Sequence, residues 1–97
     1  MKYEWDESKN RANLRKHGLD FCDAEEVFRG FLLAEPDMRE DYGEPRWVGL
    51  GQIAGRTVHI VFSERGSENI RIISLRKATK HEHKEYEKAL QDRLETN

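Results

Sequence analysis

The stretch 46-RWVGLGQIAGRTVHIVF-62, with 70-IRIISL-75 after it, decides the fold of this chain. Strand-forming residues dominate both segments, and they are interrupted by the turn Ala54-Gly55-Arg56 and by the short segment 63–69. Such short connections join antiparallel strands, because a parallel pair needs a crossover of roughly a dozen residues or more. We therefore expect an antiparallel meander.

Helical signals precede the meander. Asp6 is placed as the N-cap of a helix that ends at about His17, where a glycine follows. Asp20 can cap a second helix over residues 21–29, because apolar side chains recur there at helical spacing. Residues 2–5 alternate between polar and aromatic side chains, as a short strand does.

The remaining segments complete an α+β architecture. Residues 31–34 predict one more strand, and the acidic segment 35–45 predicts a long loop. Thr79 and Glu82 form a capping box, which opens a terminal helix. We expect a single domain over residues 1–97, in which a small antiparallel sheet is packed by two N-terminal helices and a C-terminal helix.

Composition excludes several classes of protein. Only 36% of the 97 residues are hydrophobic, and no run of roughly 18 apolar residues exists that could span a membrane. The first residues lack the apolar core of a signal peptide, so we expect a cytoplasmic protein. Cys22 is the only cysteine; it cannot form an internal disulfide, and we expect it to be a small buried side chain.

The net charge of −2 hides an uneven distribution. Residues 1–20 carry 5 basic and 4 acidic side chains, residues 21–45 carry 2 and 8, and residues 46–97 carry 10 and 7. If the acidic middle block folds to one side, the rest of the surface has a charge of +4 and attracts phosphates. The alternative is that these charges form ordinary solvated faces.

Arginine is frequent in the expected sheet. The arginines in strands or at strand ends are Arg46, Arg56, Arg65, Arg71 and Arg76. A guanidinium is always charged and presents a planar fork to phosphate oxygens, so a cluster at one sheet edge suits binding of a nucleic-acid backbone. In a regular strand Arg71 and Arg76 point to opposite faces. The alternative is exposed arginines that pair with the acidic block.

Two further positions carry candidate chemistry. Lys16 and His17 end the first predicted helix, where the helix dipole favours a protonated imidazole that acts as an acid or binds phosphate. Glu64 and Arg65 follow a strand, and such a pair is either a structural ion pair or a general base oriented by its neighbour.

A metal site is not expected. His81 and His83 are two residues apart on a helix, which places them about 200° apart around its axis, and no other His or Cys stands at ligand spacing. No Gly-rich phosphate loop, serine elbow or dinucleotide motif occurs. Metal-free acid–base and electrostatic chemistry is the class of catalysis that remains.

From about residue 3 to residue 87 the chain resembles the BrnT family of bacterial ribonuclease toxins from type II toxin–antitoxin modules. Each motif is short, but their order and spacing together are specific. The matching stretches are Tyr3-Glu4-Trp5-Asp6 with Lys9 and Asn13, Lys16-His17-Gly18, Phe21 with Ala24 and Val27-Phe28, residues 46–51, Gly55-Arg56, Glu64-Arg65-Gly66, residues 71–74 with Arg76 and Ala78, and Tyr86-Glu87.

The resemblance implies a small RelE-like fold and cleavage of RNA without a metal or another cofactor. The implied reaction is attack of a ribose 2′-hydroxyl on its own 3′-phosphate, which restricts the substrate to RNA. The resemblance also implies a cognate antitoxin, usually with a DNA-binding domain, that neutralises the toxin in a hetero-oligomer.

Site residues follow from the resemblance together with residue chemistry. Glu64 is the candidate base, Arg65 and Arg76 are the candidate cations for the transition state, and His17 is an acid or a substrate-positioning residue. The residues expected to bind the RNA are Lys16, Arg46, Arg56 and Lys80.

Two other functions stay open at this point. The first is a non-catalytic module of the same fold that only binds RNA or an antitoxin. The second is a structural subunit of another complex, whose contact is the acidic segment from Glu35 to Glu44.

Overall fold

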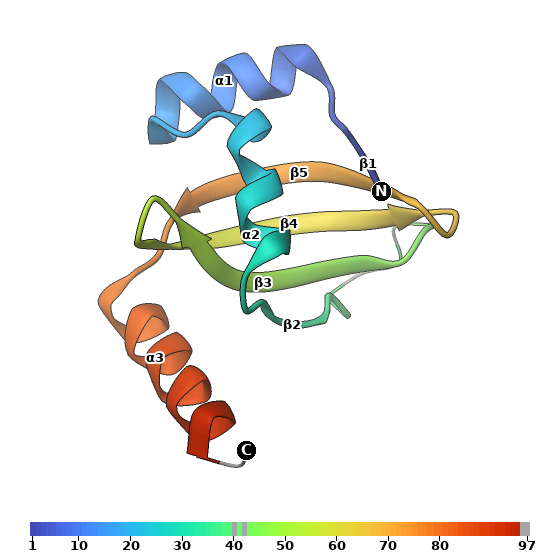
Figure 1. Ribbon diagram of the computed structural model, residues 1–97. Helices are drawn as coiled ribbons and strands as arrows, with labels where there is room; N and C mark the ends of the chain where they lie inside the picture. Colours follow the sequence, from blue (N-terminus) through green and yellow to red (C-terminus); the bar gives the residue numbers. More distant parts are fainter. Residues whose placement is uncertain (40, 42, 96–97) are drawn as a thin grey trace.

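The computed structural model describes residues 1–39, 41 and 43–95. Its elements confirm the α+β class expected from the sequence (Figure 1). In chain order they are β1 (Lys2–Glu4), α1 (Glu7–His17), the 3₁₀ turn η1 (Phe21–Ala24), α2 (Glu25–Arg29), β2 (Leu33–Pro36), β3 (Arg46–Ile53), β4 (Arg56–Arg65), β5 (Asn69–Lys77) and α3 (Lys80–Glu95).

The strands form one sheet in the order β1-β5-β4-β3-β2. The predicted meander is confirmed, because β3, β4 and β5 pair antiparallel, and β2 pairs antiparallel with β3. β1 differs, since it pairs parallel with β5 at the sheet edge. The sheet is therefore mixed, not purely antiparallel.

The N-terminal helices begin where their capping residues predict. The Asp6 carboxylate accepts hydrogen bonds from the backbone N–H groups of Ser8 and Lys9 at 2.8 and 3.2 Å, and α1 ends at Gly18 with φ of 71°. The second predicted helix is different, because its first turn is η1 and only Glu25–Arg29 is α-helical.

The side chain of Asn10 fixes the start of this 3₁₀ turn. Asn10 is buried, and its amide oxygen accepts from the backbone N–H of Phe21 at 2.9 Å while its amide nitrogen donates to Asp20 at 3.0 Å. The turn sends Phe21 and Ala24 into the core and leaves Cys22 exposed. The expectation of a buried Cys22 was wrong for this reason.

The core lies between the sheet and the layer formed by η1 and α2, which crosses the sheet in Figure 1. Phe21 and Val27 pack there against inward residues of the strands, among them Ile60 and Ile72. Gly51 allows the closest approach, because a Cβ atom at this position would lie 2.6 Å from Cγ1 of Val27.

A β-bulge in β5 changes which residues share a face. Ser74 pairs with Val61, but Ile72 pairs with the next residue of β4, so Ile73 is an extra residue. Because of this extra residue, Ile72 and Leu75 both point inward although they are three positions apart, and both lie in the core. The expectation that Arg71 and Arg76 point to opposite faces was wrong, because it assumed a regular strand.

β2 begins two residues later than predicted, and it includes the first residues of the expected acidic loop. Phe31 lies before the strand, and its ring packs on that of Tyr86 with centroids 5.5 Å apart. The Tyr86 hydroxyl also donates to the carbonyl oxygen of Phe31 at 2.8 Å. This pair of contacts joins α3 to the segment before β2.

α3 begins with the predicted capping box. The N–H of Glu82 donates to the Thr79 hydroxyl at 3.1 Å, and the N–H of Thr79 donates to the Glu82 carboxylate at 2.9 Å. At 16 residues, α3 is the longest helix of the described chain, and no described helix is long and apolar enough to cross a membrane.

We predict that Gly51→Ala destabilises the fold by about 1–3 kcal/mol, because the added methyl group overlaps Val27 in a packed core. Urea unfolding of wild type and variant at pH 7 measures this difference. Gly30→Ala is the matched control, since a Cβ atom there meets nothing within 4 Å. Equal losses in both variants would contradict the close approach at Gly51.

Candidate functional site

The face of the sheet opposite η1 and α2, which we term the second face, carries most of the charged strand residues. Paired residues of neighbouring strands point to the same side, so the register groups them into rows across this face. We term Arg46, Ser63 and Arg71 the first row, and Leu50, His59 and Arg76 the second row. The bulge in β5 is what places both Arg71 and Arg76 on this face.

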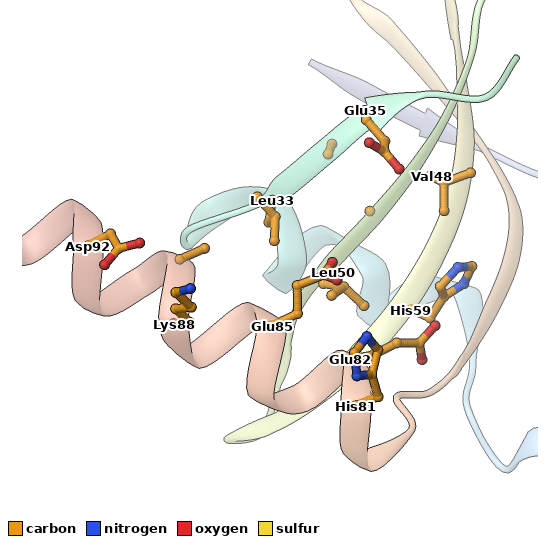
Figure 2. A pocket seen from close by; sticks show the side chains of 13 residues that line it. Leu33, Glu35, Val48, Leu50, His59, His81, Glu82, Glu85, Lys88 and Asp92 are labelled. Atoms are coloured by element: carbon orange, nitrogen blue, oxygen red, sulfur yellow. The ribbon is translucent and has the colours of Figure 1, made fainter.

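At the second row, three side chains from three elements come together. His59 of β4 lies directly across from Arg76 of β5. The Arg76 guanidinium donates to both carboxylate oxygens of Glu82 on α3, at 2.8 and 3.0 Å. Figure 2 shows the Glu82 carboxylate next to the His59 ring at one end of a groove. We term His59, Arg76 and Glu82 the His–Arg–Glu cluster.

The environment sets the charge state of each member of the cluster. Burial lowers the pKa of His59 below its usual 6.5, and the neighbouring Arg76 charge lowers it further. The hydrogen bonds from Arg76 lower the pKa of Glu82 from 4.5 to about 2, and the same bonds raise the pKa of Arg76. At neutral pH the site holds a neutral imidazole beside a fixed guanidinium–carboxylate pair.

The His59 imidazole is half-buried. Its Nδ1 atom is buried and has no hydrogen-bond partner among the described residues. A half-buried neutral histidine can accept a proton, and a guanidinium held by a carboxylate can stabilise developing negative charge on phosphate oxygens. The described residues contain no group of three or more His, Cys, Asp or Glu side chains that could hold a metal ion.

Two grooves lie on opposite sides of the first turns of α3, next to the cluster. The first, of about 540 Å³, runs between α3 and strands β2 to β4, and His59, His81 and Glu82 line one end of it (Figure 2). The second, of about 400 Å³, lies between α3 and the ends of β4 and β5. His83 lines the second groove, so His81 and His83 face different sites.

The second groove is strongly basic. Among the described residues its lining holds no carboxylate, and its permanent cations are Arg56, Lys77, Lys80 and Lys84. We term it the basic groove. Its floor is fixed by a hydrogen bond of 2.7 Å between the Thr57 hydroxyl and Nδ1 of His83. The structure thus brings together Arg56 and Lys80, two of the residues expected from the sequence to bind RNA.

The four residues expected to be catalytic do not converge. Arg65 lies on the second face, where it forms ion pairs with Glu4 at 3.9 Å and Glu44 at 3.7 Å. It stands six residues from His59 along β4, which is about 20 Å, so it is remote from Arg76. Glu64 pairs across from the core residue Ile70, and therefore points to the opposite face from Arg65.

The other expected residues lie in two further places. Lys16 and His17 form the end of α1, and no hydrogen bond or ion pair among the described residues joins them to the His–Arg–Glu cluster. Arg46 lies in the first row of the second face, on β3 across from Ser63. Arg76 is thus the one expected catalytic residue that the cluster contains.

Comparison with known families adds to this geometry. Residues 5–82 match the family model described as "Ribonuclease toxin, BrnT, of type II toxin-antitoxin system". The chain belongs to the BrnT family. Its structure is similar to the 1.1 Å crystal structure of the Brucella abortus ribonuclease toxin BrnT, with a TM-score of 0.62 and 32% sequence identity over 82% of this chain and 99% of that one. A search of curated proteins finds no match.

All three members of the His–Arg–Glu cluster lie within the part of the chain that matches the BrnT family model. Sequence reasoning missed His59, although it is a histidine in the middle of an apolar strand. The alternation of residues 57–62 indicates which face such a histidine takes. It does not indicate that Arg76 lies across from it, because the bulge sets that pairing.

We predict that Glu82→Gln lowers the stability of this BrnT-family protein by about 1–3 kcal/mol at pH 7, because a charge-assisted pair becomes a neutral one. Glutamine keeps the capping box, so the change isolates the pair with Arg76. The folded-state pKa of about 2 is below the usual 4.5, so this stabilisation is complete above pH 4.5 and is lost as the pH falls toward 2. Urea unfolding of both proteins across this range should show the difference shrinking; a constant difference would contradict the ion pair.

Proposed function

We propose that this chain is a metal-independent endoribonuclease, the toxin of a type II module, and that His59 and Arg76 form its catalytic centre. The observation that carries the proposal is the His–Arg–Glu cluster. It combines a histidine whose pKa is lowered with a guanidinium that two hydrogen bonds hold in place. Membership of a ribonuclease toxin family gives the substrate class, and the cluster supplies residues suited to the reaction.

In the proposed reaction His59 is the general base. It takes the proton from a ribose 2′-hydroxyl, and the 2′-oxygen forms a bond to the adjacent phosphorus. The bond from phosphorus to the 5′-oxygen of the next nucleotide breaks, which leaves a 2′,3′-cyclic phosphate. The departing 5′-oxygen takes a proton from solvent. The steps use protein groups, RNA and solvent water.

Arg76 stabilises the charge that develops on the phosphate oxygens during this attack. Glu82 is a positioning residue, because its carboxylate fixes the orientation of the guanidinium through two bonds. A guanidinium fixed before the reaction costs no reorganisation when the charge appears. This assignment uses neither Glu64 nor His17, because neither lies at the cluster.

The basic groove is the proposed binding site for the RNA backbone beyond the cleaved bond. Arg56 and Lys80 line it next to the cluster, and phosphate contacts by such cations supply most of the sequence-independent affinity for nucleic acid. Arg46, in the first row of the second face, is a proposed further contact. Lys16 lies outside both regions, on α1.

The proposal includes the partner and the place of action. The family implies an antitoxin. We propose that this antitoxin carries a DNA-binding domain, forms a hetero-oligomer with the chain and blocks cleavage of RNA in the cytoplasm. The competing function is a non-catalytic module that only binds RNA. Measured cleavage of RNA distinguishes the two, because a binding module does not cleave it.

We predict that His59→Gln and Arg76→Ala each abolish cleavage of a labelled single-stranded RNA in excess chelator, by about a hundredfold or more. The DNA of the same sequence should stay intact, because it lacks the 2′-hydroxyl. Glu64→Gln is the matched control and should keep most of the activity. Cleavage that survives in His59→Gln would contradict the assigned base, and an intact RNA that is only bound would favour the binding module.

The pH profile gives an independent readout. Neutral His59 is the active form, so cleavage falls as the pH drops through the pKa of His59, which lies below 6.5. We predict an acid limb of kcat/KM with its midpoint below pH 6.5. The residual activity of His59→Gln should lack that limb. A limb centred well above 6.5 would point to a different base.

We predict that Arg56→Ala with Lys80→Ala weakens RNA binding uniformly across sequences and lowers the slope of log Kd against log salt by about 1–2. Fluorescence anisotropy at several salt concentrations measures both. The double variant Lys9→Ala with Arg11→Ala removes the same charge from α1 and serves as control. Equal weakening in the two double variants would show that net charge, and not the basic groove, sets the affinity.

A further inference from the structure

The first groove has the opposite charge to the basic groove. Of the side chains that line it away from the His–Arg–Glu cluster, Glu35, Glu85 and Asp92 are acidic and Lys88 is basic. Figure 2 shows Glu35 on β2 and Glu85 on α3 facing the groove from its two walls. We term it the acidic groove. Carboxylates on both walls repel phosphates, so the part of this groove away from the cluster does not suit an RNA backbone.

The floor of the acidic groove is apolar. Leu33, Val48 and Leu50 of the sheet form it, and Ala89 of α3 adds to the helix wall. An apolar floor between acidic walls fits a polypeptide segment that has apolar residues on one side and lysine or arginine on the other.

The position of the groove connects it with catalysis. It ends at His59, His81 and Glu82, so a segment that fills it reaches the His–Arg–Glu cluster. A partner bound there would close access to the imidazole without competing for the basic groove. Its binding would thus block the reaction directly.

The helix wall of the groove also lies beyond the family match. The match ends at Glu82, and Glu85, Lys88 and Asp92 follow it on α3.

We infer that the acidic groove between α3 and β2 to β4 is the docking site for a basic amphipathic segment of the cognate antitoxin, and that Glu35 and Glu85 recognise it. This inference rests on the proposed function for the existence of a neutralising partner. The position of the groove gives the location of the segment, and the acidic walls and apolar floor indicate that the segment is basic on one side and apolar on the other.

The test uses the double variant Glu35→Lys with Glu85→Lys of the full chain. The probe is the purified antitoxin of the same type II module, and calorimetry gives its Kd. We expect Kd to rise at least about tenfold at low salt, and the effect to shrink as salt screens the walls. Cleavage of RNA by the free variant should stay at the wild-type rate, because neither residue belongs to the cluster or to the basic groove. Neutralisation of that cleavage should need correspondingly more antitoxin.

The matched control is Glu68→Lys with Asp23→Lys, which changes the net charge equally on the exposed β4–β5 turn and on η1. An unchanged Kd in the groove variant, or an equal rise in both double variants, would overturn the inference. Stronger RNA binding by the groove variant would show that the groove holds RNA. Sedimentation measures the oligomeric state of both proteins. A dimer of the wild type that is absent in the groove variant would show that the acidic groove holds a second copy of the chain.

The calorimetric readout does not depend on catalysis. If the wild-type chain fails to cleave RNA while the groove variant still loses antitoxin affinity, the proposed function fails and the docking site stands. If cleavage is present and the affinity is unchanged, the docking site fails and the proposed function stands.

Discussion

The bulge at Ile73 is the constraint on which the rest of the site depends. A strand alternates strictly, so without the extra residue Leu75 could not lie inward together with Ile72. The same residue places Arg76 across from His59 on the second face. The side chain of Asn13 holds the strand just beyond the bulge, because its amide donates to the Leu75 carbonyl at 2.8 Å and accepts from the Leu75 N–H at 3.3 Å. α1 thus acts on the site through β5 without contributing a residue to it.

α3 separates two electrostatic environments within a few residues. Its first turns place Lys80 and Lys84 along one side and Glu85 along the other, and Tyr86 fixes the helix to Phe31 on a third side. Helical periodicity makes this division possible, because residues three or four apart share a face. The His–Arg–Glu cluster lies beside the first turn of α3, and its members His59 and Glu82 line the end of the acidic groove. A neutral base and a bound guanidinium at that point fit the proposed reaction on a phosphate.

Most of the elements could be predicted from the sequence because their signals are local. The caps Asp6 and Gly18, and the box formed by Thr79 and Glu82, involve residues within a few positions of each other. Short connections likewise fix the meander of β3 to β5. Phe31 was harder to place, because its partner Tyr86 is 55 residues away, and no local pattern reports such a contact.

The candidate site was predicted only in part for the same reason. Arg76, Arg56 and Lys80 were identified from their chemistry, and the structure brings them to one region around the start of α3. Glu64 and Arg65 are neighbours in sequence, yet alternation sends them to opposite faces. His59 gains its role from burial and from Arg76 and Glu82, and neither condition is visible in its own segment.

The sequence by itself determined the family, the α+β class, the caps of the helices and the residue types available for chemistry. These depend on composition, on short-range hydrogen bonds and on periodicity, which are properties of residues close together in the sequence. Only the tertiary structure decided which of those residues meet. The bulge in β5 shifts a register. The meeting of His59 with Arg76, and the two grooves beside α3, join segments distant in sequence. Packing, not local propensity, sets such contacts.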